Sequence, residues 1–239
     1  MTFDPFGDFA TCGYLRNLEK EKDPALVKRL EHASFTTGID DAFAALAKGK
    51  PVTYADVLST HKTLFEAFYP WAGQDRMTTA PDIAVSRGGV LFANPKYIQS
   101  AVEYALKIGN DPAQMKEMPG EVMGYLAHGH PFLDGNGRTI MVAHCALAQR
   151  AGFSIDWAAT DKTAYLAALT EELDDPGRGI LDEFLKPFIR PAVEDLSRHI
   201  AAAKGLDGGA GETDQVYGRN DDPAVQAEYD QQQLKREQR

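Results

Sequence analysis

The sequence has few cysteines, no long apolar run and no positively charged N-terminus. Its two cysteines, Cys12 and Cys145, fit neither a metal-ligand spacing nor a disulfide framework, so two ordinary buried thiols are expected. The first residues are acidic where a signal peptide would be basic, and no apolar run is long enough to span a membrane. We therefore expect a soluble protein of a reducing cytoplasm with no membrane partner. Export directed by a C-terminal signal stays open.

The sequence also lacks an excess of positive charge, since its formal net charge is −10 at pH 7. A general nucleic-acid binder normally presents a basic face, so we expect no nucleic-acid partner, although a local basic pocket could still hold a nucleotide. What is present is a chain of 239 residues that is 44% hydrophobic. That length and composition suffice for one medium-sized domain with a substantial core, and they leave the oligomeric state unknown.

Helical periodicity dominates the chain, with apolar residues recurring every three or four positions. Two helices are expected after Asp23, joined by ASFTTG at residues 33–38, and Thr53 is a good N-cap for the next helix. The glycine-punctuated stretch IAVSRGGVLF predicts a short β-hairpin that turns at residues 87–89. Further helices are expected over residues 95–108, 112–128, 138–151, 162–173 and 180–203.

After about residue 203 the composition shifts to Gly, Asp and Gln, with few large apolar residues. This composition predicts a flexible polar tail over residues 204–239, with at most a frayed helix at its very end. The domain would then comprise residues 1–203, with its core at about residues 14–190. The patterns together predict an all-α fold class with one small β-hairpin.

The polar chemistry of the chain is concentrated in HPFLDGNGR at residues 130–138, immediately before an apolar helical stripe. A helix that begins near Gly137 would offer unpaired backbone N–H groups and the positive end of its dipole. Glycines let an anion approach such groups closely, and Arg138 adds a forked cation that suits phosphate oxygens. These features predict a phosphate-binding site.

Two further side chains make this phosphate site a candidate catalytic site. Asp134 offers a carboxylate, and Mg²⁺ is commonly held by one or two carboxylates together with substrate phosphates. His130 can accept a proton near neutral pH. Together they indicate phosphoryl or nucleotidyl transfer to a hydroxyl. The alternative is an ordinary capped helix start with a solvent-facing histidine, which has no use for so many polar groups.

HPFLDGNGR resembles the motif of the Fic family, His-Pro-Phe-x-Asp/Glu-Gly-Asn-Gly-Arg-x-x-Arg, and the resemblance extends over roughly residues 14–190. THKTLFEAFYPWAGQDR at residues 60–76 is similar to a second family pattern, and IAVSRGGVLFANPKYI resembles the family's flap. The resemblance implies a Fic fold, which is a helical domain with a β-hairpin flap. It also implies a protein adenylyltransferase that moves AMP from ATP to a hydroxyl of a target protein.

Carried over residue by residue, the resemblance implies that His130 deprotonates the target hydroxyl and that Asp134 holds Mg²⁺. The backbone of residues 135–137 (Gly135, Asn136 and Gly137) would form the anion hole, and Arg138 would bind phosphate. The target protein would pair with the flap as an added strand. The flap comprises Ile83, Ala84, Val85, Ser86, Arg87, Gly88, Gly89, Val90, Leu91 and Phe92.

The sequence departs from the motif at its last position, where Met141 replaces the second arginine. A residue three positions after Arg138 lies on the same helix face, so this side chain either looks toward the nucleotide or fills a gap in the core. In the family the second arginine contacts the outer phosphates of ATP and pairs with the glutamate of an inhibitory helix. No clean inhibitory motif is visible here, and the resemblance leaves a separate small antitoxin-like inhibitor open.

Met141 also keeps two other functions open. One is a transferase for another donor, such as phosphate, another nucleoside monophosphate or phosphocholine, because the family's Doc-type toxins carry an apolar residue there and transfer a phosphoryl group. Their loop reads Ala-Asn-Lys where this one is glycine-rich, which favours nucleotidyl transfer. The other is a weakly active or inactive scaffold that binds a nucleotide or a protein. His61, Trp71 and Arg76 are expected to be structural supports.

Overall fold

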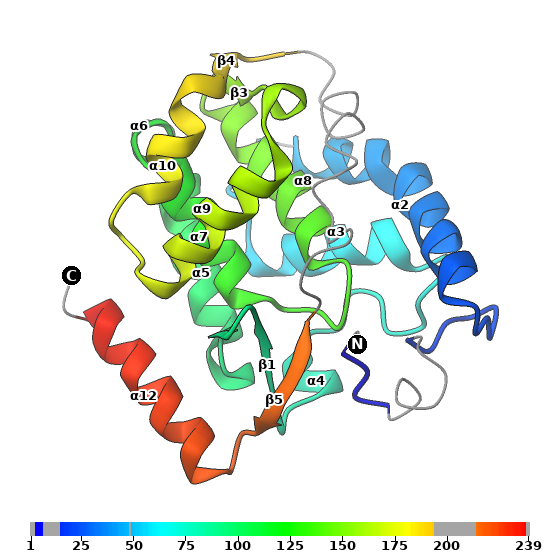
Figure 1. The fold of residues 1–239 in the computed structure, drawn as a ribbon. Coiled ribbons are helices and arrows are strands. Elements are labelled where there is room, and N and C mark those ends of the chain that lie inside the picture. The colour runs from blue at the N-terminus through cyan, green and yellow to red at the C-terminus, as the bar shows by residue number, and fades with distance from the viewer. Residues whose placement is uncertain (1–2, 7–14, 48, 194–213, 238–239) are drawn as a thin grey trace.

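The structure is a computed structural model that describes residues 3–6, 15–47, 49–193 and 214–237, and it is mostly helical (Figure 1). Its α-helices are α2 (Pro24–Leu46), α3 (Tyr54–Phe65), α4 (Arg76–Thr79), α5 (Ile98–Gly109), α6 (Pro112–Glu117), α7 (Pro119–Gly129), α8 (Asn136–Arg150), α9 (Lys162–Asp174), α10 (Ile180–Leu185) and α12 (Pro223–Glu237). Its strands are β1 (Ile83–Arg87), β2 (Val90–Leu91), β3 (Phe153–Ile155), β4 (Ile189–Pro191) and β5 (Gln215–Arg219), and its 3₁₀ turns are η1 (Pro95–Tyr97), η2 (Trp157–Ala159) and η3 (Lys186–Phe188).

Helices α7 and α8 lie at the centre of the domain (Figure 1). Helix α7 packs against α5, α9 and α10, whereas α8 packs against α2, α3 and β3. Helix α8 is buried from Thr139 to Ala148, which its run of alanines and aliphatic residues on every face permits. The loop that joins α7 to α8 therefore starts and ends inside the core, and its residues are held in place from both sides.

Two small antiparallel sheets complete the described part of the fold. Strands β1 and β2 form the predicted hairpin, with φ angles of 59° at Gly88 and 80° at Gly89, as a two-residue turn of this hand requires. Strand β5 pairs with the other edge of β1, so the strand order is β2-β1-β5. Strands β3 and β4 form the second sheet. The hairpin thus has no free edge on the β1 side.

Several predicted local signals are confirmed. Thr53 caps α3, as predicted, in a reciprocal capping box with Asp56. The structure adds a second cap, since Asp161 accepts the Ala164 N–H at the start of α9. The Cys145 thiol is buried and free, as expected, while Cys12 lies outside the described residues. Short-range capping chemistry therefore set these helix starts.

Other boundaries differ from the prediction. ASFTTG lies inside the continuous helix α2 and does not join two helices. Its glycine, Gly38, permits the close packing of α2 on α3, because an added Cβ would come 2.3 Å from the Thr63 carbonyl oxygen. Residues 112–128 form two helices, since Pro119 has no N–H to continue the first one. The helix predicted over residues 180–203 ends at Leu185, as α10. Residues 194–203 of the predicted range lie outside the described residues.

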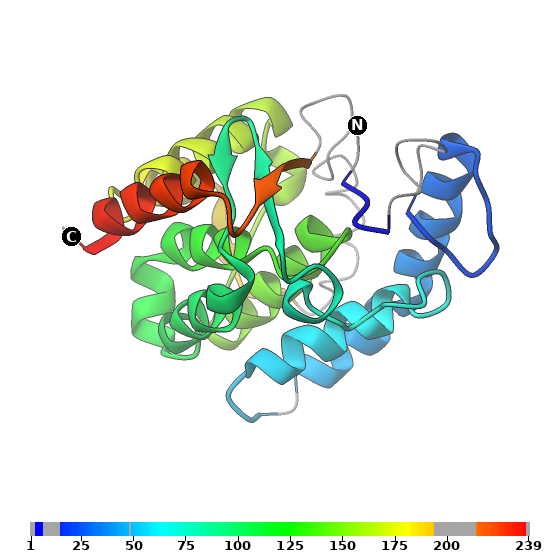
Figure 2. The same cartoon turned by 90° about the horizontal axis from the view of Figure 1, so that it is seen from below.

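The C-terminal segment also differs from a flexible tail. Residues 194–213 are not described, but residues 214–237 contain β5 and then α12, which runs alongside the hairpin (Figures 1 and 2). The expected polar helix at the end is therefore present, and a strand precedes it. Composition could not predict this strand, because pairing with β1 uses backbone groups and needs few apolar side chains.

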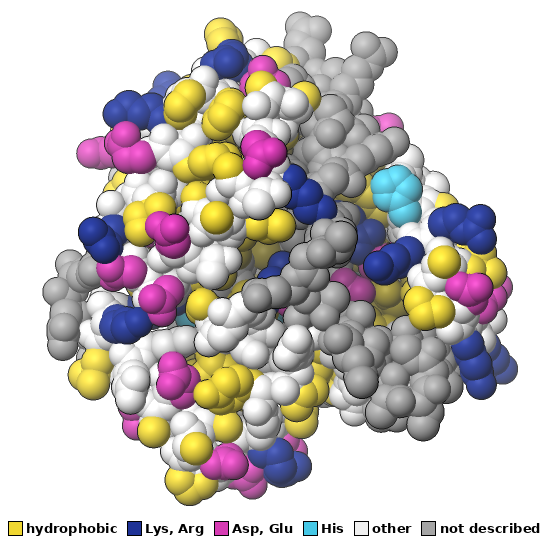
Figure 3. Space-filling view, in the orientation of Figure 1, with side chains coloured by type: hydrophobic (Ala, Val, Ile, Leu, Met, Phe, Trp, Pro, Cys, Tyr) yellow, Lys and Arg dark blue, Asp and Glu magenta, His cyan; other side chains and the backbone are white. Residues whose placement is uncertain are grey.

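Within the described residues, no helix is long and apolar enough to cross a membrane. On the face shown in Figure 3, basic and acidic side chains of the described residues are interspersed, without a continuous basic area.

Candidate active site

The loop between α7 and α8 carries HPFLDGNGR and contains two left-handed backbone positions. His130 ends α7 with φ 42° and ψ 58°, which is uncommon for a residue with a side chain. Gly135 precedes α8 with φ 74°, and an added Cβ would come 2.5 Å from the Phe65 ring. This glycine is therefore required both by its dihedral angle and by the ring beside it. A strained histidine held by its surroundings is typical of functional sites.

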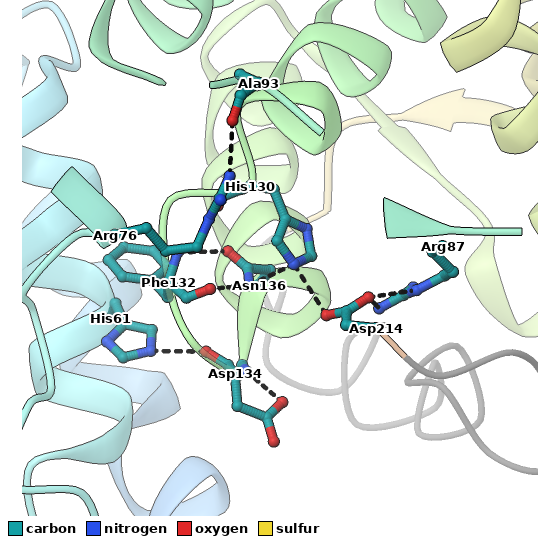
Figure 4. Close-up of polar contacts among 10 residues, drawn as sticks. His61, Arg76, Arg87, Ala93, His130, Phe132, Asp134, Asn136 and Asp214 are labelled. Atoms are coloured by element: carbon teal, nitrogen blue, oxygen red, sulfur yellow. Dashed lines mark hydrogen bonds and ion pairs between the residues drawn. The ribbon is translucent and has the colours of Figure 1, made fainter. Parts of the chain in front are cut away.

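The strained segment at His130 is held by Arg76, which is fully buried. Arg76 donates from Nε to the His130 carbonyl oxygen at 2.8 Å and from Nη2 to the Ala93 carbonyl oxygen at 2.9 Å (Figure 4). The His130 ring stacks on Phe92 at the end of the hairpin, with 3.7 Å between centroids and 6° between planes. The hairpin and the α7–α8 loop are thus locked together, and Arg76 is the structural support that the sequence predicted.

Asn136 ties the loop together with its side chain. Its Oδ1 accepts the Phe132 N–H at 2.8 Å, and its Nδ2 donates to the Phe132 carbonyl oxygen at 2.7 Å. The same Nδ2 lies 3.0 Å from His130 Nε2 (Figure 4). The sequence predicted only a backbone role for Asn136, whereas the structure places its amide between the loop and the imidazole.

The Nε2 side of the His130 ring is covered by a residue from the C-terminal segment. Asp214 Oδ2 lies 2.9 Å from His130 Nε2, and Asp214 Oδ1 accepts from both Nε and Nη2 of Arg87, each at 2.7 Å (Figure 4). Burial lowers the pKa of His130 to about 4, although Asp214 works in the opposite direction. Burial alone would raise the pKa of Asp214, but His130 and Arg87 outweigh it and hold that pKa at about 2.

His61 supports the loop from beneath. Its Nε2 lies 3.0 Å from the Asp134 carbonyl oxygen, and its Nδ1 accepts the Gly73 N–H at 2.9 Å (Figure 4). These two contacts require a neutral ring with its proton on Nε2, and burial lowers the pKa of His61 to about 3. His61 is therefore a structural support, as predicted.

The Asp134 side chain meets the requirements of a Mg²⁺ ligand. Its Oδ1 accepts the Gly135 N–H at 2.6 Å, and burial raises the pKa of the carboxyl, while Arg138 acts against this. A bound cation would stabilise the carboxylate in such a place. The described residues contain no group of three metal-ligating side chains, so the other ligands would be phosphate oxygens and water, as is usual for Mg²⁺.

Arg138 is already engaged by an acidic side chain that the sequence did not single out. Its Nη2 donates to Glu31 Oε1 of α2, and the two side chains are only 10% and 8% exposed. The guanidinium also lies 4.8 Å from the centroid of the Phe65 ring. The cation predicted to bind phosphate thus forms a buried ion pair with a carboxylate.

Met141 lies one turn after Arg138 and is 5% exposed, within the main hydrophobic core. Of the two interpretations of this departure from the motif, this burial favours the residue that fills a gap in the core.

The sequence predicted His130, Asp134, residues 135–137 and Arg138 as one site, and the structure brings these residues together around the start of α8. The sequence analysis did not identify Glu31 and Asp214 as residues of this site. Glu31 had a detectable signal, since a charged residue interrupts the buried stripe of α2. Asp214 had none, because only the folded chain brings it to His130.

Comparison with known families finds that the model of the Fic/DOC family matches residues 51–148, a range that includes α3, the hairpin, the α7–α8 loop and most of α8. The chain is 32% identical over 163 residues to protein adenylyltransferase VbhT of Bartonella schoenbuchensis, which covers 64% of this chain and 32% of that protein. It is 29% identical over 125 residues to probable protein adenylyltransferase y4lH of Sinorhizobium fredii, covering 48% of this chain and 62% of that protein. The chain therefore spans less than two thirds of the length of either relative.

Among solved structures, the BepC protein of Bartonella tribocorum, a VirB-translocated effector protein with bound AMPPNP, aligns with a TM-score of 0.60 at 20% identity. The alignment covers 77% of this chain and 95% of that chain. At this level of identity the likeness concerns the fold, and it confirms the predicted helical fold with a small hairpin.

Proposed function

Since the model of the Fic/DOC family matches residues 51–148, we propose that this chain is a member of that family and transfers AMP from ATP to a hydroxyl side chain of a target protein. The names of VbhT and y4lH, both given as protein adenylyltransferases, support this activity. The AMPPNP bound to BepC supports ATP as the co-substrate.

One observation carries the proposal: His130 Nε2 lies 3.0 Å from the side-chain amide of Asn136, the first residue of α8. A proton acceptor therefore adjoins the start of a helix, where unpaired N–H groups and the helix dipole favour an anion. Nucleotidyl transfer to a hydroxyl needs these two capacities in one place. An ordinary helix start needs neither of them.

In the proposed reaction the target hydroxyl oxygen attacks the α-phosphorus of ATP and forms a new P–O bond. The bond from that phosphorus to the bridging oxygen of the β-phosphate breaks, and pyrophosphate leaves. His130 Nε2 takes the proton of the hydroxyl. Because burial lowers the pKa of His130 to about 4, the imidazole is neutral at pH 7 and can accept this proton once no other group occupies Nε2.

The phosphates of ATP would bind at the start of α8. The backbone N–H groups of Asn136 and Gly137 and the guanidinium of Arg138 are the donors, and Arg138 would exchange Glu31 for a phosphate oxygen. Asp134 would hold Mg²⁺, which would neutralise phosphate charge when bound. The target would pair with the edge of β1 in the hairpin.

Labelled nucleotides and a bacterial or host lysate test the proposal. The assay uses the wild type, Asp214→Ala, in which the reactive nitrogen is uncovered, and the double variant Asp214→Ala/His130→Ala. We expect label from α-³²P-ATP on a lysate protein with Asp214→Ala and none with the double variant. Label from γ-³²P-ATP alone would replace AMP transfer by phosphorylation. Nucleotide binding without transfer from ATP, other nucleotides or a phosphocholine donor would identify a binding scaffold.

A further inference from the structure

Strand β5 pairs with the β1 edge of the hairpin, the edge to which the proposed function assigns the target. It runs antiparallel to β1, with Ser86 opposite Gln215 and Val85 opposite Val216, and the register shifts by one residue before Ala84 pairs with Gly218. Continued by one residue, this register brings Asp214 opposite Arg87, where their side chains meet. The chain's own C-terminal segment thus pairs with the β1 edge, where a target that bound by strand addition would pair.

The contact between Asp214 and His130 prevents the imidazole from acting as a base. Asp214 is ionised at neutral pH, so its Oδ2 can only accept, and the proton of the neutral imidazole must then lie on Nε2. A ring nitrogen that carries this proton has no free lone pair, so it cannot accept a proton from a hydroxyl. Asn136 Nδ2 lies 3.0 Å from the same nitrogen, and it can donate there only when Asp214 is absent.

Helix α12 anchors the strand on the outside of the hairpin (Figure 2). Val225 is 4% exposed and forms a small apolar cluster with Ala84 of β1 and Leu91 of β2. Gly218 makes room for it, since an added Cβ would come 2.9 Å from Val225. At the far end, Lys235 pairs with Asp174 of α9 at 3.0 Å. The segment is therefore fastened at both ends of α12 as well as by its strand pairing.

We propose that residues 214–237 act as a built-in substrate mimic: β5 occupies the target-binding edge of the hairpin, and Asp214 stands where the target's hydroxyl residue would stand. This inference rests on the proposed function, because it needs the hairpin to be the target site. It implies that a target binds as an extended segment antiparallel to β1, with its modified side chain opposite Arg87. It also implies that the segment must leave before a target can bind.

A second role for Asp214 would be to orient His130 as part of a catalytic pair. The geometry argues against it, because an orienting carboxylate binds the imidazole nitrogen that does not react. Here Asp214 binds Nε2, the nitrogen beside Asn136 and the start of α8. The two roles predict opposite results, since loss of an orienting residue lowers transfer and loss of a mimic raises it.

Docking of the segment can be measured without nucleotide in the full chain. Nitrogen-15 NMR of histidine reports which ring nitrogen of His130 carries the proton, and hydrogen exchange reports the pairing of residues 215–219. We expect the proton on Nε2 and slow exchange in the wild type, with both lost in Asp214→Ala. Val225→Asp should have the same effect from the anchor, without touching His130. Asp221→Ala, an exposed acid in the same segment, is the matched control.

Activity then tests the mimicry. Asp214→Thr and Asp214→Ser place a hydroxyl before His130, so after incubation with ATP and Mg²⁺ we expect one AMP on residue 214 by intact mass and fragmentation. The adduct should be absent from the wild type and from Asp214→Thr/His130→Ala. Labelling of lysate proteins should rise by about tenfold or more in Asp214→Ala and Val225→Asp, the factor that corresponds to about 1.4 kcal/mol of lost docking.

The outcomes separate this inference from the proposed function. Rapid exchange at residues 215–219 in the wild type, or a His130 tautomer that Asp214→Ala leaves unchanged, would overturn the docking. If labelling of lysate proteins falls in Asp214→Ala, Asp214 orients His130 and the mimicry is overturned. If lysate proteins are labelled but Asp214→Thr and Asp214→Ser carry no AMP on residue 214, the mimicry is also overturned. Confirmed docking with no transfer by any variant would support occupancy of the hairpin edge and would refute AMP transfer instead.

Discussion

Glu31 and Arg138 form a buried ion pair although 107 residues separate them in the chain. The contact joins α2 to the first turn of α8, at the place where the proposed phosphate site begins. Because a buried arginine cannot leave its counter-ion without a replacement, nucleotide phosphate and Glu31 would compete for one cation under the proposed function. The N-terminal helix α2 would then be coupled to the proposed donor site.

Glu31→Gln should strengthen ATP binding. The variant keeps the shape of the side chain but removes the charge that competes with phosphate, so we expect affinity to rise by about tenfold, or about 1.4 kcal/mol. Without nucleotide, the free energy of unfolding should fall by about 1–3 kcal/mol, because Arg138 loses its carboxylate. Calorimetry and urea unfolding measure the two effects. Asp40→Asn, an exposed acid of the same helix, is the control, and equal ATP affinity in Glu31→Gln and wild type would show that phosphate does not use Arg138.

Arg76→Met should destabilise the site and the fold together. Arg76 is fully buried and serves the carbonyl oxygens of His130 and Ala93, which would both lose their donor. We expect a loss of about 3 kcal/mol in urea unfolding and little transfer activity in whatever protein stays folded. Arg178→Met, on a side chain that is 60% exposed, should change stability by less than about 0.5 kcal/mol. Similar stability for the two variants would refute this role for Arg76.

His144 should make stability depend on pH. It is fully buried, its Nε2 lies 2.8 Å from the Pro119 carbonyl oxygen, and burial lowers its pKa to about 4. In the unfolded chain His144 binds a proton below about pH 6.5, whereas in the folded protein it stays neutral down to about pH 4. Its contribution to the free energy of unfolding is therefore complete above pH 6.5, and it is lost by about 1.4 kcal/mol per pH unit as the pH falls toward 4. In urea unfolding from pH 7.5 to 4.5, the free energy of unfolding should change less with pH for His144→Gln than for the wild type. Identical slopes in the two proteins would contradict the assignment.

Met141→Arg, which restores the family motif, should lower stability without improving ATP binding. The side chain is 5% exposed within the core, so an arginine there would bury a charge, at a cost of about 3 kcal/mol or more. Met141→Leu should cost less than about 1.5 kcal/mol. Thermal unfolding and calorimetry with ATP measure both effects. A Met141→Arg protein that is as stable as wild type and binds ATP more tightly would show that residue 141 reaches the nucleotide.

Local signals predicted much of this fold because their physics is local. The N-cap at Thr53 and the turn glycines of the hairpin both depend on a few neighbouring residues. The continuous helix α2 escaped prediction, since Gly38 looks like a helix breaker unless its contact with α3 is known. Contacts between distant segments therefore decided the boundaries that the local pattern left ambiguous.

The sequence by itself determined which residues could perform the chemistry. HPFLDGNGR places a base, a carboxylate and a glycine-rich helix start in nine consecutive residues, and no folded neighbour is needed to see that they adjoin. Only the tertiary structure decided what those residues contact. Glu31 and Asp214 reach Arg138 and His130 from helices and strands far away in the chain, because burying a charged or polar group requires a partner and the fold supplies the nearest one. One short segment identifies the site, whereas access to it depends on where Glu31 and Asp214 pack in the folded chain.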